Sequence, residues 1–266
     1  MTLSRKTVSK PIHFEGLGLH TGVPVKMTVH PSSDGISFRL GADRVIAAPE
    51  NVTDTTRSTK LGQIGTIEHL MSAFAGLEVT DAEVELTAPE VPGMDGSSWP
   101  FVEALQAAGL EDCGHAEIPQ LYRRVFIKEG DTEIAVAKGT GHWRYVYNTG
   151  ARWPGNQPYE ALSVIESYAQ EISKARTFAF AEEIPMIIQL GLGKGLDEAS
   201  ALILGIEGYK NEARFEDEPA RHKLLDLIGD LYLAGVPIRL LNVVSERSGH
   251  TANVKAAAML KQATEA

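Results

Sequence analysis

The chain has 266 residues, of which 43% are hydrophobic and 23% are charged, the composition of an ordinary globular protein. This balance excludes intrinsic disorder, collagen-like repeats and small disulfide-bonded scaffolds. At roughly 150 residues per domain, the length favours two domains over one. The formal net charge is −10 and the sequence carries no strong basic patch, so we do not expect it to bind nucleic acid.

The cysteine content and the apolar stretches bear on the compartment. The single Cys113 cannot form an intramolecular disulfide, which fits a reducing environment. Residues 1–16 are polar and basic and lack the apolar core of a secretion signal. The longest apolar stretches are about as long as residues 231–238, far short of the ~18 residues that cross a bilayer. We expect a cytoplasmic protein without a transmembrane segment, while peripheral contact with a membrane stays open.

The first half of the chain reads as short strands followed by two helices. Strands are predicted at 10–14, 25–30, 36–39 and 82–87, separated by glycine- and serine-containing turns. Helices are predicted at 66–76, with Thr66 as the N-cap, and at 99–109. A polar stretch broken by glycine and proline follows at 111–119. It places a domain boundary between residues 1–118 and residues 119–266.

The second half begins with strands again and ends with long helices. Strands at 125–128, 133–137 and 143–148 are predicted to form a meander, followed by a strand and a short helix within 158–172. A strand–helix–strand unit is predicted over 175–205, and the clearest helix over 219–234, with Pro219 in its first turn and Gly235 at its end. A strand at 238–245 and a helix at 251–262 complete the chain. Because strands and helices are segregated within each half, the predicted fold class is α+β.

The helix predicted at 219–234 carries a pattern that suits a metal ion. His222 and Asp226 are four residues apart and therefore share one helix face, and Asp230 lies one turn further along it. An imidazole and a carboxylate on one face can bind the same cation. Taken alone, the pattern is more often an exposed polar face.

Other histidines could complete such a site. Glu68 and His69 are adjacent near the start of a helix, and such a pair can supply a general base and a ligand to a catalytic zinc. Alternatively, Glu68 only favours the positive end of the helix dipole. His250 follows Gly249 in a tight turn, and His20 lies in a glycine-rich segment. No phosphate-binding loop or nucleophilic-serine motif is complete, and Cys113 has no activating neighbour in sequence.

Six blocks, taken together and in order, resemble the zinc-dependent UDP-3-O-acyl-N-acetylglucosamine deacetylases of lipid A biosynthesis. They are GLHTG at 18–22, TIEHLMSA at 66–73, PGMDGS at 92–97, ARTF at 175–178, RHKLLDLIGDL at 221–231 and SGH at 248–250. The resemblance spans nearly the whole chain. It implies two α+β domains, each a sheet layered on helices, with the active site between them.

The resemblance also implies the roles of individual residues. The zinc ligands would be His69, His222 and Asp226, and iron(II) would suit the same donors. The catalytic groups would be Glu68 as the general base, His250 as the general acid, Asp230 as its partner, Thr177 as a hydroxyl donor to the oxyanion and Lys223 as an added positive charge. Substrate contacts would come from His20, Phe178, Leu192 and Leu196, and the unit at 175–205 would form a passage for the acyl chain. The implied partner is a UDP-sugar lipid substrate bound by a monomer.

One departure from the family pattern leaves alternatives open. After the GLGKG segment at 191–195 the family commonly continues with a second glycine and a serine, whereas this chain has Leu196 and Asp197. This difference allows a zinc amidase acting on another N-acetylated sugar nucleotide or glycolipid. A zinc-binding homologue without catalysis is the third alternative. The joint presence of Glu68, Thr177, Asp230 and His250 argues against it, because a structural zinc site needs none of them.

Overall fold

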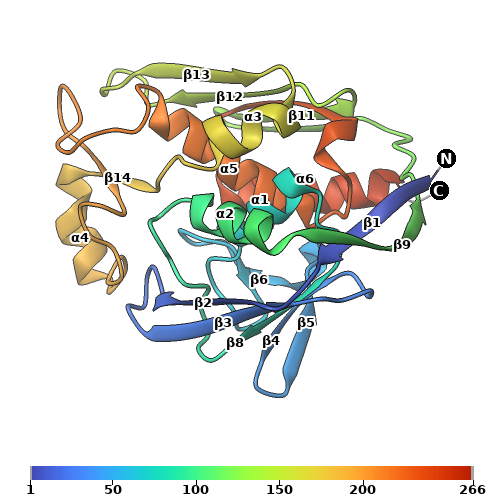
Figure 1. The fold of residues 1–266 in the computed structure, drawn as a ribbon. Helices are drawn as coiled ribbons and strands as arrows, with labels where there is room; N and C mark the ends of the chain where they lie inside the picture. The colour runs from blue at the N-terminus through green and yellow to red at the C-terminus, as the bar shows by residue number, and fades with distance from the viewer. Residues whose placement is uncertain (1, 265–266) are drawn as a thin grey trace.

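A computed structural model describes residues 2–264 of the chain. Two five-stranded sheets form the outer layers, and the main helices lie between them (Figure 1). The predicted α+β class is therefore confirmed. No helix within residues 2–264 combines the length and the apolar character needed to cross a bilayer.

The first sheet is built entirely from the first ninety residues. Its strand order is β2-β3-β8-β4-β5, and all neighbours are antiparallel except β4 and β8. The strands are β2 (Ile12–Leu17), β3 (Pro24–His30), β4 (Ile36–Leu40), β5 (Asp43–Ile46) and β8 (Ala82–Leu86). A short pair, β6 (Val52–Asp54) and β7 (Lys60–Leu61), connects this sheet to the first central helix.

The second sheet repeats the topology of the first. Its order is β10-β11-β16-β12-β13, again with one parallel pair, here β12 and β16. The strands are β10 (Val125–Glu129), β11 (Thr132–Lys138), β12 (Trp143–Asn148), β13 (Asn156–Ala161) and β16 (Leu241–Glu246). The predicted meander is wrong, because the last strand inserts between β11 and β12 after a helical crossover, as a parallel neighbour requires. No strand pairing joins the two sheets within residues 2–264, and a boundary at residue 118 stays a prediction.

The helices fill the space between the sheets. They are α1 (Glu68–Leu77), α2 (Trp99–Ala108), α3 (Val164–Ser167), α5 (Glu218–Tyr232) and α6 (His250–Thr264), with short helical turns at η1 (Pro49–Asn51), η2 (Tyr168–Ile172) and η4 (Ile238–Leu240). The predicted N-cap is wrong: α1 begins after Ile67, and Thr66 has φ +57°. Thr66 instead donates its hydroxyl to Glu90 at 2.9 Å. A contact with a residue 24 positions away overrides the local capping preference.

The polar stretch between the two halves of the chain contributes to a strand pair that the sequence pattern did not predict. Residues of β1 (Thr2–Val8) pair antiparallel with β9 (Leu110–Glu117), so much of the polar stretch at 111–119 is a strand. Cys113 lies in this ribbon, and its thiol donates to Asp81 at 3.3 Å. Burial and the Asp81 carboxylate raise the pKa of this thiol, which keeps it in the unreactive protonated form.

A small projecting unit is inserted into the second half. It consists of β14 (Phe178–Phe180), η3 (Ala181–Glu183), α4 (Ile184–Gln189) and β15 (Leu202–Leu204), with β14 and β15 parallel. Figure 1 shows α4 at the left edge of the molecule, outside the two main layers. The predicted strand–helix–strand order is confirmed.

The core of the fold depends on a close crossing of α1 and α5. Gly229 of α5 faces the carbonyl oxygen of Glu68, and a Cβ atom at this position would overlap that oxygen and lie 3.1 Å from the amide nitrogen of Ser72. Only glycine allows the two helix backbones to approach so closely. The first turn of α1 and the middle of α5 are thereby brought together.

We expect Gly229→Ala to destabilise the protein by about 3 kcal/mol, because the added methyl group forces the two helices apart in a packed core. Chemical denaturation measures this change in the free energy of unfolding. Gly208→Ala is the matched control, since no atom lies within 4 Å of its added Cβ. Equal stability of the two variants would contradict the packing argument.

Candidate active site

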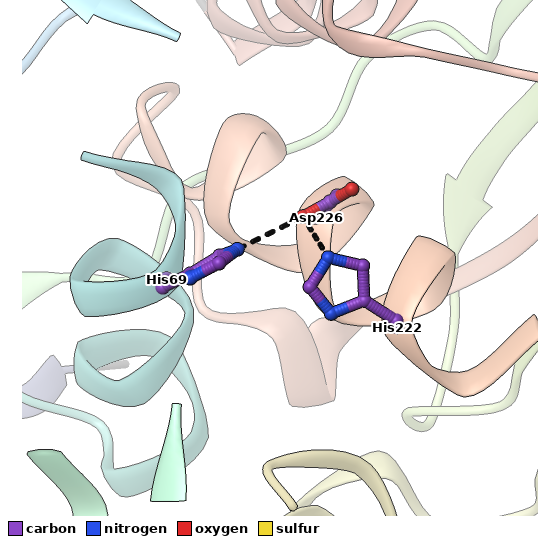
Figure 2. A group of neighbouring side chains, drawn as sticks. All are labelled: His69, His222 and Asp226. Carbon is purple, nitrogen blue, oxygen red and sulfur yellow. Dashed lines mark ion pairs between the residues drawn. The ribbon is translucent and has the colours of Figure 1, made fainter. Parts of the chain in front are cut away.

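Three side chains from two helices meet where α1 and α5 cross. His69 comes from α1, and His222 and Asp226 come from successive turns of α5 (Figure 2). The Nε2 atoms of His69 and His222 lie 3.6 and 3.5 Å from Oδ1 of Asp226. The two imidazole rings meet edge to face, with centroids 5.1 Å apart. All three residues are buried, so the predicted ligand residues do share one location.

The donor atoms are arranged to receive a cation. Asp226 Oδ1 is buried and has no hydrogen-bond partner in the part of the chain that the structure describes. The Nδ1 atom of His222 lies 3.1 Å from the carbonyl oxygen of Ala175, to which it donates, so the Nε2 lone pair faces Asp226 and His69. An unpaired carboxylate oxygen opposite two imidazole nitrogens fits a divalent transition metal with an open coordination position.

The charges at this point favour metal binding. Lys223 donates to Asp226 Oδ2 at 2.8 Å and leaves Oδ1 free. Burial alone would favour the neutral acid, but Lys223 and His222 outweigh it and hold the pKa of Asp226 well below its usual range. Burial lowers the pKa of His222 to about 3. At neutral pH, Asp226 is therefore an anion and His222 a neutral imidazole, the forms that ligate metals.

The predicted base and acid lie side by side next to the three ligand residues. Glu68 is buried, and its Oε1 atom is 3.9 Å from Nε2 of His250. Burial raises the pKa of Glu68 against the opposing influence of His250 and His69. Burial would lower the pKa of His250, but the charge and hydrogen bond of Asp230, with Nδ1 and Oδ2 3.0 Å apart, outweigh it and raise that pKa to about 9. His250 is therefore the protonated partner.

The remaining predicted residues surround one cavity of about 730 Å³. His20, Thr177, Phe178, Leu192, Leu196 and Lys223 line this cavity together with the ligand residues, Glu68 and His250. Asp230 is fully buried behind His250 and does not line the cavity. The Phe178 ring stands edge-on to His222, with ring centroids 5.9 Å apart.

The cavity continues from the polar residues into the projecting unit. There it is lined by apolar side chains: Ile184, Ile187, Ile188, Leu192, Leu196 and Ile203. We call this apolar part of the cavity the apolar arm. A cavity with a polar part and an apolar arm suits an amphiphilic ligand, whose reacting group would lie beside His69, His222 and Asp226 and whose hydrocarbon chain would lie in the arm.

Two buried carboxylates outside the cavity were not found by the sequence analysis. Glu90 accepts hydrogen bonds from the backbone of His20 and Thr21 and from the hydroxyl of Thr66, which ties the glycine-rich segment to the start of α1. The Oε1 atom of Glu218 accepts from the backbone and guanidinium of Arg176, at 2.9 and 3.0 Å, beside Thr177. Neither residue belongs to one of the six matched blocks, so only their long-range contacts identify them.

Thr59 is a third buried residue that the sequence analysis did not find, and it has no exposed surface. It contacts Glu68, Asp230 and His250 at once. No helix periodicity or motif marks it, because it lies in the short loop between β6 and β7.

A carboxylate base and an imidazole acid next to a metal-binding group can together activate water and protonate a leaving group. This arrangement fits the class of metal-dependent hydrolases. The comparison with known families makes the assignment specific. The model of the family described as LpxC, UDP-3-O-acyl N-acetylglycosamine deacetylase, matches residues 5–262, and the chain belongs to this family.

Individual relatives cover almost the whole chain. A protein from Cellvibrio japonicus (strain Ueda107) is 36% identical over 99% of this chain and 92% of its own length. A relative from Aquifex aeolicus (strain VF5) is 36% identical, and the match covers 94% of this chain and 90% of that protein. A relative from Teredinibacter turnerae (strain ATCC 39867 / T7901) is 37% identical, and the match covers 94% of this chain and 88% of that protein. All three are named UDP-3-O-acyl-N-acetylglucosamine deacetylase. The resemblance recognised in the sequence is thus confirmed.

We expect His69→Ala and His222→Ala to lose most of the bound metal, because each removes one of three protein donors to a single ion. Elemental analysis after dialysis measures the metal content. His142→Ala is the control, since this partly exposed histidine pairs with Glu160 on the second sheet, away from the cavity. A full equivalent of metal retained in both ligand variants would contradict the site.

Proposed function

We propose that this protein is a zinc-dependent hydrolase that removes the N-acetyl group of UDP-3-O-acyl-N-acetylglucosamine. The products are acetate and UDP-3-O-acyl-glucosamine, in a step of lipid A biosynthesis. Family membership and the names of the relatives support the reaction. The observation that carries the mechanism is the unpaired Oδ1 of Asp226 facing two imidazole nitrogens.

A zinc ion held by His69, His222 and Asp226 would lower the pKa of a bound water and polarise the acetamide carbonyl. Zinc suits two imidazoles and one carboxylate with an open fourth position, and iron(II) accepts the same donors. The protein must then move protons around that water. Glu68 is placed for the first transfer, because its carboxylate lies beside His69 and faces the cavity. It would accept the proton of the attacking water.

His250 is placed for the second proton transfer. Its Nε2 atom faces Glu68 and Asp226, both at 3.9 Å, and Asp230 holds the opposite ring nitrogen. The imidazolium would donate the Nε2 proton to the departing amine, which is otherwise a poor leaving group. Asp230 favours the charged ring before the transfer and fixes which nitrogen carries the reacting proton.

Thr177 and Lys223 would stabilise the negative charge that develops on the acetamide oxygen. The backbone of Thr177 is held by Gly96, whose carbonyl accepts from its amide at 2.7 Å, and by Leu202, whose amide donates to its carbonyl at 2.9 Å. A hydroxyl on so fixed a backbone is a preorganised donor. Lys223 adds a positive charge and is itself held by Asp226.

The apolar arm of the cavity would bind the 3-O-acyl chain, and Leu196 would limit its length. Leu196 takes the place of the expected glycine and lines the cavity among its apolar residues. Asp197 also lines the cavity, and its carboxylate accepts from the hydroxyl of Ser200 at 2.7 Å. The position of Leu196 beside the apolar residues is what connects the altered segment with chain length. A non-catalytic role is disfavoured, because the base, the acid and its partner all lie beside the ligand residues.

The proposal includes a monomer in the cytoplasm. Every residue to which we assign a role belongs to one chain, so a second copy is not needed to complete the site. Nucleotide sugars are cytoplasmic metabolites, and a UDP-sugar substrate therefore favours that compartment.

We expect Glu68→Ala and His250→Ala to keep the metal and to lose about 10²- to 10⁴-fold in kcat, the usual contribution of a positioned acid or base. Acetate release and metal content are measured on the same samples. Glu103→Gln, on the exposed face of α2, is the control. Turnover at the parent rate in either the Glu68 or the His250 variant would contradict the catalytic role proposed for that residue.

We expect kcat/KM to fall by at least about 100-fold, equivalent to ~2.7 kcal/mol, when the 3-O-acyl group is removed from the substrate. Burying one CH₂ is worth ~0.8 kcal/mol, so half of a ten-carbon chain contributes about 4 kcal/mol before its ordering cost. Acetate release from a series of acyl lengths measures this dependence. It also tests the reaction itself, because no acetate from any member would refute the proposed function.

The same series tests the role of Leu196. Leu196→Ala should move the preferred acyl length upward by opening the arm, whereas Leu162→Ala, 76% exposed beyond β13, should not. If kcat/KM did not change with acyl length, the proposed acyl passage would be contradicted and a substrate without an acyl chain would be favoured.

A further inference from the structure

Thr59 connects groups that come from three different helices of the fold. It lies between β6 and β7, and its side chain is completely buried. Its hydroxyl donates to Oδ1 of Asp230 on α5 at 2.5 Å and lies 3.3 Å from Nδ1 of His250 on α6. Its amide donates to Oε2 of Glu68 on α1 at 3.0 Å. These partners are 171, 191 and 9 residues away in the chain.

The hydroxyl of Thr59 determines how the Asp230 carboxylate is turned. One oxygen, Oδ1, accepts from Thr59, while Oδ2 accepts from Asn253 Nδ2 and from His250 Nδ1, both at 3.0 Å. A carboxylate on a flexible side chain is fixed when both oxygens have directed donors. With Oδ1 engaged, Oδ2 points at the imidazole, and Nε2 of His250 is left facing the cavity.

The backbone of Thr59 forms hydrogen bonds with Glu68 and Ile67. Its amide holds Oε2 of Glu68, so that Oε1 is the oxygen directed toward His250 Nε2, 3.9 Å away. Its carbonyl accepts from the amide of Ile67 at 3.3 Å, at the residue that precedes α1. Substitution of the side chain leaves these two backbone contacts available, so the function of the hydroxyl can be tested separately.

We propose that Thr59 is a positioning residue for deacetylation, which aligns His250 through Asp230 while its backbone aligns Glu68. The inference rests on the proposed function. Thr59 does not line the cavity, so it acts on turnover through its partners rather than by touching the substrate. Loss of the hydroxyl should therefore lower kcat and leave KM and the metal content unchanged.

The test compares Thr59→Val with Thr59→Ser. Valine keeps the shape of threonine but cannot donate, whereas serine keeps the donor and lacks only the methyl group. We expect kcat of Thr59→Val to fall by about 10- to 100-fold, a part of the 10²- to 10⁴-fold that positioned acid–base groups contribute. KM should change by less than about twofold, with a full equivalent of metal, and Thr59→Ser should keep kcat within about threefold of the parent.

A double-mutant cycle and a crystal structure separate positioning from a general packing role. If Thr59 acts through Asp230, Thr59→Val should cost much less in an Asp230→Asn background than in the parent. The structure of Thr59→Val should show the Asp230 carboxylate and the His250 ring rotated from their parent positions, with α1 and α5 unmoved.

The results that overturn the inference are distinct from those that overturn the function. Parent-like kcat in Thr59→Val, an equal loss in Thr59→Ser, or additive losses with Asp230→Asn would each overturn the positioning role. Absence of acetate release by the parent protein would instead overturn the proposed function.

Discussion

The site exists because two helices cross closely enough for their backbones to touch. Gly229 lets α5 approach the carbonyl of Glu68 at the first turn of α1. This approach brings His69 within 3.6 Å of Asp226, although the two residues belong to different halves of the chain. The repeated sheet topology places α1 and α5 in equivalent positions, each before the strand that enters the middle of its sheet. One tight crossing thus joins the two repeats and brings together the residues that we propose carry the chemistry.

Burial of so many ionisable groups at this crossing has to be compensated. Glu68, Asp226, Asp230 and His250 have almost no exposed surface, and isolated charges in such a place are costly. The structure compensates with paired partners: Lys223 for Asp226, Asp230 for His250, and Thr59 for both Glu68 and Asp230. Asp226 Oδ1 is the exception, and a bound cation would supply its missing partner. The pairing therefore stabilises a preorganised set of groups and leaves the Oδ1 atom of Asp226 free to ligate a metal ion.

The sequence predicted those parts of the fold that depend on local patterns. The ends of α5 were predicted to within two residues, since Pro219 and Gly235 mark them locally. The insertion of β16 between β11 and β12, and the pairing of β1 with β9, depend on contacts between distant segments and were missed. Thr66 shows the same conflict, because its bond to Glu90 replaces the cap that its residue type favours. Thr59, Glu90 and Glu218 were missed for this reason too, whereas the matched motifs identified the residues around the metal-binding group.

Anomalous X-ray diffraction at the zinc edge, from crystals of the zinc-loaded protein, tests the central claim most directly. The account predicts one strong peak about 2.0–2.2 Å from Nε2 of His69, Nε2 of His222 and Oδ1 of Asp226, the usual distances for zinc ligands. Glu68 and His250 should stand beside the peak without ligating it. A catalytically active, zinc-loaded crystal whose only peak lies elsewhere would contradict the account.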